Sequence, residues 1–299
     1  MRIGYIGLGA MGRPMAVNIA SAGHSLVVAD LDEARTEILR QRGADVAGSA
    51  KEVADEADFV MACLPNLNAA EAVAAAVAEG ARAKAFVNMG TTGSAYSKAV
   101  AAEMAKAGKA FLDAPISGGP AGAEAATLGV MCSGDRATFE ALKETALDAI
   151  SAKLVYLGEE PGAAQVMKLV NNIIFFGNVA VALEAMTLGA KAGLDPEQML
   201  EVINASSGRN TATEWWIPNH VLSGLYDFNA GNYIVEKDLE LWRREAEAYE
   251  TPMWLGSTIR TLVHASIAKE GRDADYTTLS RTLEEWAGAE IPKTRAPKG

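Results

Sequence analysis

The stretch IGYIGLGAMG, residues 3–12, decides how the rest of the chain is interpreted. It continues a β-prone run at Arg2–Ile6 into three glycines, and a helical pattern follows over Arg13–Ala22. A second apolar strand at Ser25–Ala29 is followed by Asp30, 18 residues after the last of these glycines. A G-x-G-x-x-G run is weak on its own. Between a strand and a helix, with an acid after the next strand, it predicts a dinucleotide-binding βαβ unit.

The three glycines have distinct expected roles. Gly7 forms the tight turn, Gly9 lets the backbone approach a pyrophosphate, and Gly12 lets the helix and the strand pack closely. Asp30 would accept hydrogen bonds from the adenosine ribose hydroxyls and repel a 2′-phosphate, which favours NAD over NADP. Arg35 could still bind a 2′-phosphate, so NADP stays open. A glycine turn without a nucleotide is the alternative to this interpretation.

Strands alternate with helices through the first half of the chain. This alternation predicts an α/β Rossmann domain with a doubly wound, mostly parallel sheet. Further strands are expected at Asp58–Leu64, Ala85–Asn88, Ala110–Asp113, Gly129–Ser133 and Leu154–Leu157, of which the last two could be antiparallel additions. Helices are expected at Glu33–Arg42, Ala69–Ala83 and Ser94–Ala107. We expect cofactor contacts also from the glycine stretch and after the third and fourth strands, at Ala10, Met11, Leu64, Pro65 and Thr91.

The second half of the chain has a different pattern. Ala163–Ala192 is apolar nearly all round, which predicts a buried helix about 45 Å long. It suits the central helix of an all-α substrate and oligomerisation domain over residues 161–299, after a Rossmann domain over residues 1–160. Further helices are expected at Pro196–Asn204, Lys237–Tyr249, Trp254–Lys269 and Leu279–Ala287. The tail Ile291–Gly299, with two prolines and three charged side chains, is expected to be loose.

Composition excludes several classes of protein. The 299 residues are 49% hydrophobic with a net charge of −11, which argues against a nucleic-acid partner. Two cysteines and three histidines, dispersed along the chain, give no disulfide scaffold and no metal-site spacing. No uninterrupted apolar run of 18 residues is present and the chain opens without a signal-like segment, so we expect no membrane partner and a cytoplasmic location.

Several motifs together resemble the β-hydroxyacid dehydrogenase family, which includes 3-hydroxyisobutyrate dehydrogenase and tartronate semialdehyde reductase. They are the opening run 3–24, DAPISGG at 113–119, GAAQVMKLVNN at 162–172, SSGR at 206–209 and EKDLEL at 236–241. The resemblance covers nearly the whole chain. It implies a Rossmann domain followed by an all-α domain, a homodimer or homotetramer, and reversible NAD-dependent oxidation of the hydroxyl of a small carboxylate substrate.

The resemblance also implies the roles of individual residues. Lys168 is the implied catalytic lysine, and Asn172 binds substrate. Lys237 and Asp238 close the site from the helical domain, toward cofactor and substrate respectively. The chemistry of Lys168 agrees, because burial in an apolar helix lowers the pKa of a lysine and lets it accept the alcohol proton. The alternatives are a lysine whose amine reaches water and, for Lys237 and Asp238, a solvated pair.

Ser117, Gly118 and Gly119 would hold the substrate carboxylate by the same resemblance. A Ser-Gly-Gly turn after a strand exposes consecutive N–H groups and a hydroxyl, which suits an anion. The alternative is a plain turn.

The chain departs from the family at a few positions. Ala164 stands where a glycine is usual, which could crowd the cofactor, and Trp242 replaces a small residue. Trp215 and Trp216 follow the SSGR segment. These tryptophans either belong to the core or line a pocket for a substrate that is bulkier or aromatic. Two competing functions remain: imine reduction, which Lys168 disfavours, and a catalytically silent dinucleotide-binding protein.

Overall fold

The computed structural model describes residues 1–294. The chain divides into two compact units, Met1–Lys168 and Leu169–Gly299, and each is described by itself. The division falls inside the long helix α8 (Ala163–Lys191), a few residues beyond the expected 160/161 boundary.

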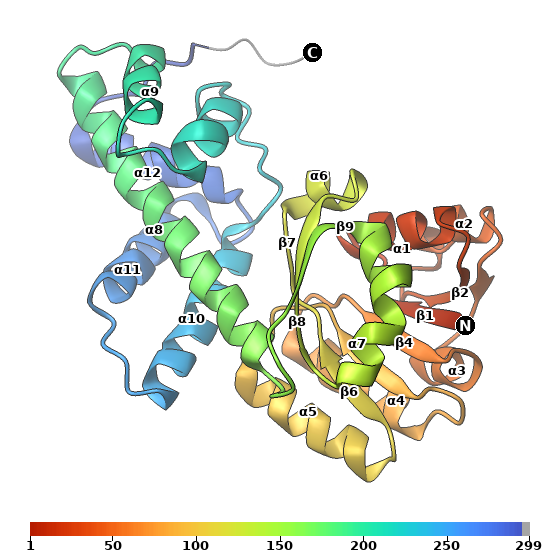
Figure 1. Cartoon of the computed structure of the whole chain (residues 1–299). Coiled ribbons are helices and arrows are strands. Elements are labelled where there is room, and N and C mark those ends of the chain that lie inside the picture. The colour runs from red at the N-terminus through yellow and green to blue at the C-terminus, as the bar shows by residue number, and fades with distance from the viewer. Residues whose placement is uncertain (295–299) are drawn as a thin grey trace. The chain divides into compact units, whose positions relative to one another are not determined.

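The first unit is built on a nine-stranded sheet within the described residues (Figure 1). Its strands are β1 (Arg2–Ile6), β2 (Ser25–Ala29), β3 (Asp45–Val46), β4 (Phe59–Ala62), β5 (Ala85–Asn88), β6 (Ala110–Asp113), β7 (Ile116–Ser117), β8 (Leu128–Gly134) and β9 (Ser151–Tyr156). The order is β3-β2-β1-β4-β5-β6-β8-β7, with β9 paired to β8. β1 to β6 pair in parallel, and β8 is antiparallel to β6. The predicted doubly wound, mostly parallel sheet is confirmed.

Helices cover both faces of this sheet, as expected for parallel strands. One face packs against α1 (Gly12–Ser21), α2 (Glu37–Arg40), α6 (Gly119–Glu124) and α7 (Arg136–Leu142). The other packs against α3 (Ala50–Glu56), α4 (Leu67–Glu79) and α5 (Ser94–Lys106). Each face has its own apolar core, so the unit consists of three layers (Figure 1).

The second unit is helical. It contains most of α8, then α9 (Pro196–Asn204), α10 (Asn232–Ala248), α11 (Trp254–Glu270) and α12 (Leu279–Ala287). A π-helical segment, Ala212–Val221, lies between α9 and α10. Its core combines one side of α8, including Phe176 and Leu183, with the buried aromatic rings of Trp216 and Tyr276. The predicted all-α second part is therefore confirmed.

The expected burial of α8 on all sides is wrong. Three apolar residues spaced seven apart are exposed, Ile174 by 58%, Val181 by 60% and Leu188 by 71%. By length and composition alone this helix could cross a membrane, a test that core helices of globular proteins also pass. Because Val179 and Leu183 lie in the core of the second unit, α8 is buried on one side and apolar on both.

Two other expectations are corrected. The helix expected at Glu33–Arg42 breaks into a 3₁₀ turn, Glu33–Arg35, and the short α2, because the Thr36 hydroxyl bonds the Glu33 carbonyl oxygen. The tail is not loose where it is described, because Ile291 is fully buried and the Thr294 N–H donates to the Leu222 carbonyl. The rest of the expected loose tail, residues 295–299, lies outside the described residues.

Candidate active site

The predicted cofactor residues of the first unit gather at one edge of the sheet. Parallel strands place their carboxyl ends together, and loops there form the ligand crevice of such folds. The ladder continues past β4 and β5, since the Cys63 N–H donates to the Ile6 carbonyl at 3.0 Å and the Met89 N–H to the Ala62 carbonyl at 2.9 Å. Three loops therefore lie next to one another: the glycine loop, the loop with Leu64 and Pro65, and the loop with Thr91.

The glycine loop has a geometry that its three glycines explain separately. Gly7 has φ +89°, and a Cβ there would meet the Cys63 carbonyl oxygen at 2.4 Å. A Cβ on Gly12 would meet the Gly7 carbonyl oxygen at 1.9 Å, because α1 starts directly against the turn. A Cβ on Gly9 would meet nothing closer than the Arg35 guanidinium at 3.8 Å. Gly9 thus leaves its backbone uncovered, which is a cradle that fits a pyrophosphate.

Asp30 lies under this loop with its side chain only 9% exposed. Its carboxylate accepts the Leu8 N–H at 2.6 Å and the Asp32 N–H at 2.9 Å. Arg35 lies 3.9 Å from the same carboxylate and bonds Asp32 at 3.1 Å. Asp30 therefore fixes the glycine loop as well as presenting an acid beside it, a structural role that sequence reasoning did not foresee.

The Ser117–Gly118–Gly119 turn joins β7 to α6. Gly118 has φ +134° and Gly119 has φ +64°, a pair of conformations that side chains rarely adopt. A Cβ on Gly118 would also approach the Leu128 side chain to 3.0 Å. The turn thus depends on both glycines for its shape, and its assignment to a carboxylate stays a prediction.

Lys168 lies in the second turn of α8 and is 8% exposed. So little contact with water disfavours the alternative in which its amine reaches solvent. The preceding turn is held by buried side chains that the sequence analysis did not single out. Gln165 and Asp113 are both fully buried and hydrogen-bonded to each other at 2.9 Å. Asp113 is the first residue of the DAPISGG motif and Gln165 lies within the lysine motif, but the sequence did not predict their contact.

The second unit brings three predicted residues together. The Asn172 amide donates to the Asp238 carboxylate at 2.7 Å, and the Lys237 ammonium lies 2.7 Å from the other oxygen of that carboxylate. The Asp238 side chain is only 6% exposed. Asn172 and Lys237 are half-buried, so the buried Asp238 carboxylate is held between two polar partners from α8 and α10. The helix α10 begins at Asn232, five residues before the predicted start at Lys237.

The four departures from the family pattern have separate outcomes. Trp216 is fully buried in the core, and Trp242 covers Gly256, where a Cβ would meet its ring at 2.2 Å. Trp215 is 41% exposed and makes edge contacts with neighbouring aromatic rings. Ala164 is buried with its N–H donated to the Ser133 hydroxyl at 2.9 Å.

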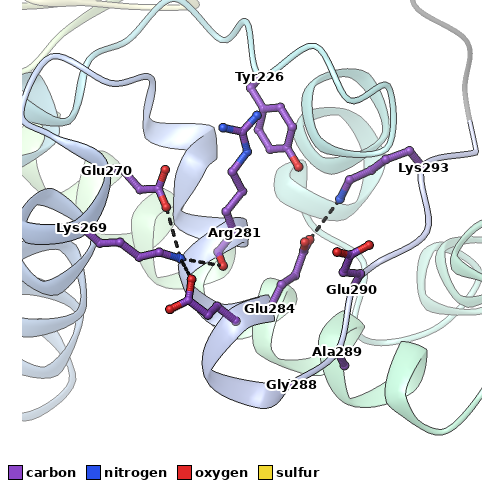
Figure 2. Close-up of a pocket in the computed structure, with 10 residues that line it drawn as sticks. Tyr226, Lys269, Glu270, Arg281, Glu284, Gly288, Ala289, Glu290 and Lys293 are labelled. Carbon is purple, nitrogen blue, oxygen red and sulfur yellow. Dashed lines mark hydrogen bonds and ion pairs between the residues drawn. The ribbon is translucent and has the colours of Figure 1, made fainter.

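A pocket of about 900 Å³ in the second unit contains none of the predicted residues (Figure 2). Its charges are compensated locally: Lys293 bonds Glu284 at 3.0 Å, and Arg281 stacks on the Tyr226 ring at 3.9 Å (Figure 2). Burial raises the pKa of Glu284. We interpret this hollow as a salt-bridged surface feature of the helical unit.

Comparison with known proteins agrees with both units. Residues 2–158 match the family model of the NAD-binding domain of 6-phosphogluconate dehydrogenase. Residues 162–283 match the NAD-binding model of NADP-dependent 3-hydroxyisobutyrate dehydrogenase. The fold and the matched models define an NAD-binding, dehydrogenase-type protein.

Individual relatives narrow this class. The chain is 32% identical to 2-(hydroxymethyl)glutarate dehydrogenase of Eubacterium barkeri, covering 97% of each chain. It is 31% identical to mitochondrial 3-hydroxyisobutyrate dehydrogenase of Mus musculus, covering 95% of this chain and 87% of the relative. This chain belongs to the β-hydroxyacid dehydrogenase family.

Solved structures support the same assignment. The 3-hydroxyisobutyrate dehydrogenase of Mycobacterium tuberculosis, solved with L-serine, superposes with a TM-score of 0.86 at 28% identity, covering 94% of this chain and 98% of the other. An imine reductase of Streptomyces aurantiacus reaches 0.64 at 20% identity, covering 95% and 99%, and so shares the fold alone.

Proposed function

We propose that this chain transfers a hydride reversibly between NAD(H) and the carbinol carbon of a β-hydroxyacid resembling 3-hydroxyisobutyrate. The observation that carries the proposal is the position of Lys168, which is buried near the start of α8. The preceding turn of α8 contains Gln165, which is hydrogen-bonded to Asp113 at the carboxyl end of β6. The glycine loop lies at the carboxyl end of β1 in the same sheet. The relatives at 31–32% identity are hydroxyacid dehydrogenases, whereas the imine reductase is more distant.

The chain supplies binding and proton transfer. NAD, when bound, takes up the hydride that leaves the carbinol carbon. The uncovered backbone at Gly9 and the acid at Asp30 would hold the dinucleotide, with NAD favoured over NADP. Ala10, Met11, Leu64, Pro65, Thr91 and Lys237 complete the proposed cofactor contacts.

Lys168 acts as the general base in oxidation and as the general acid in reduction. Its neutral amine accepts the hydroxyl proton as the carbon–hydrogen bond breaks, and its ammonium returns that proton in the reverse direction. Ser117, Gly118 and Gly119 would bind the substrate carboxylate, and Asn172 and Asp238 would orient the substrate. Trp215 is the most exposed of the three tryptophans that the sequence analysis singled out, so the hypothesis of a bulkier substrate depends on that residue.

The role of Lys168 is tested by Lys168→Ala. We expect turnover to fall by about 10²- to 10⁴-fold because the general acid and base is lost, while NADH binding, measured by fluorescence titration, is retained. The matched control is Lys51→Ala, which removes an exposed lysine paired with Asp55 on α3 and should leave turnover unchanged. Unchanged turnover in the Lys168 variant would remove the proposed mechanism.

We further propose that the chain forms a homodimer or homotetramer through the exposed stripe of α8 and acts in the cytoplasm. The stripe consists of Ile174, Val181 and Leu188, whose seven-residue spacing suits packing against a second helix. Large exposed apolar patches commonly mark interaction surfaces. A second copy of this chain presents the same stripe.

A further inference from the structure

Asp113 is a carboxylate placed where a charge is costly. It is the last residue of β6 and is fully buried. Four groups donate to it: the Ser97 hydroxyl at 2.7 Å, the Gln165 amide at 2.9 Å, the Asn88 amide at 3.2 Å and the Gly162 N–H at 2.9 Å. Burial raises the pKa of Asp113, and these hydrogen bonds oppose that rise. Such a site is stable only as a completely satisfied network.

Gln165 extends this network to the loop after β5. Its side-chain oxygen accepts the Thr92 N–H at 2.9 Å and the Gly93 N–H at 3.3 Å. Its side-chain nitrogen donates to the Gly90 carbonyl at 3.0 Å as well as to Asp113. The side chain therefore joins α8 to the loop that contains Thr91, one of the predicted cofactor contacts.

The network also caps the start of α8. The first N–H groups of a helix lack partners within the helix. Here the Gly162 N–H, just before α8, donates to Asp113 on β6, and the Ala164 N–H donates to Ser133 on β8. By contrast, α3, α4, α7 and α9 are capped by the residue directly before each helix: Ser49, Asn66, Asp135 and Asp195. The start of α8 is thus fixed to the carboxyl ends of distant strands.

We propose that Asp113 and Gln165 are positioning residues that hold Lys168 in its working place relative to the cofactor loop after β5. Lys168 lies three residues after Gln165, so the two share one side of α8 over adjacent turns. A turn fixed on one side to Asp113 and on the other to Gly90, Thr92 and Gly93 cannot shift without breaking buried hydrogen bonds. The inference rests on the proposed role of Lys168 and adds what keeps that residue in place.

Asp113→Asn tests this directly. The new amide nitrogen is itself a donor, and it must face at least one of the N–H or O–H groups that donate to the carboxylate in the wild type. We expect kcat to fall by about 10- to 100-fold, since small misplacements of a reacting group have effects of this size. NADH affinity should stay within about 3-fold, because the glycine loop is untouched. The matched control, Asp135→Asn, makes the same chemical change in the cap of α7 and should leave kcat unchanged.

A double-mutant cycle separates positioning from general stability. If Asp113 acts through Lys168, adding Asp113→Asn to Lys168→Ala should lower the residual turnover by less than about 2-fold. If Asp113→Asn still lowers turnover by about 10- to 100-fold in the Lys168→Ala background, the inference is overturned while the role of Lys168 stays intact. A normal kcat in the folded Asp113→Asn single variant would have the same consequence. Wild-type turnover in Lys168→Ala would overturn both.

A second variant covers the case in which Asp113→Asn does not fold. Gln165→Met keeps a similar side-chain volume but removes the amide, so the Thr92 and Gly93 N–H groups lose their acceptor, and Asp113 and Gly90 lose a donor. We expect the same kcat loss with retained NADH affinity, and the same absence of further loss with Lys168→Ala. Normal kcat in this variant would contradict the proposal.

Discussion

Gly9 and Gly12 belong to the same motif, but the surroundings of the two residues differ in the way their predicted roles require. Gly12 is required by the protein itself, since a Cβ would overlap the Gly7 carbonyl oxygen at 1.9 Å. Gly9 has open space around it, with nothing within 3.8 Å of a Cβ. The requirement for glycine at position 9 therefore comes from the ligand that binds over the loop.

This difference gives a prediction at the residue scale. Gly9→Ala should keep the melting temperature of the wild type but weaken NADH binding by about 10-fold or more, a difference of roughly 1.4 kcal/mol. Gly12→Ala should lower both the melting temperature and the affinity, because α1 must move. Thermal unfolding and fluorescence titration measure the two effects. A Gly9 variant with unchanged affinity would contradict the placement of a dinucleotide on this loop.

Single residues were predictable from the sequence where their role is local. The glycine loop and Asp30 lie within one βαβ unit, so spacing alone predicts them. Asp113 and Gln165 were not predicted as a pair because their contact joins residues 52 positions apart. Sequence reasoning marked their motifs and missed the network that joins them.

At the scale of elements, periodicity located the strands and long helices well. β1, β2, β5 and β6 have the expected bounds, and α8 differs from its prediction by one residue at its end. The π-helical segment Ala212–Val221 was not predicted, because Pro218 inside it is a residue that normally ends a helix. Short elements such as β3 and α3 carry too few apolar positions to show a period.

The exposed stripe of α8 is where prediction from composition failed most clearly. The apolar composition of α8 predicts a helix that is buried on all sides, but Ile174, Val181 and Leu188 face outward in the described chain. Composition cannot distinguish burial within one chain from burial between two copies. The stripe therefore leads to a prediction about assembly.

Val181→Glu combined with Leu188→Glu should convert the oligomer to a smaller species. Two carboxylates in an apolar helix contact would each lose their hydration, which strongly disfavours association. Light scattering after size-exclusion chromatography measures the mass. Val202→Glu is the matched control, because Val202 is 66% exposed on α9 and is not part of the stripe, so its variant should keep the wild-type mass. A monomeric wild type, or an unchanged mass in the double variant, would contradict the proposed interface.

The whole molecule combines a Rossmann unit with a helical unit, and each carries residues that the sequence predicts to be functional. The first unit carries the glycine loop, the Ser117–Gly119 turn and Lys168. The second carries the hydrogen-bonded group of Asn172, Lys237 and Asp238. Family membership is established by relatives matched over nearly the full length of the chain.

The formation of NADH or NADPH by the purified protein, measured with a panel of β-hydroxyacids each supplied with NAD or NADP, tests the proposed activity most directly. We predict oxidation of at least one 3-hydroxyisobutyrate-like acid, with a higher kcat/KM for NAD than for NADP because of Asp30. A preference for larger side chains would support a pocket lined by Trp215, and its absence would remove that hypothesis. If none of the acids is oxidised and cyclic imines are reduced instead, the proposed β-hydroxyacid dehydrogenase activity is contradicted.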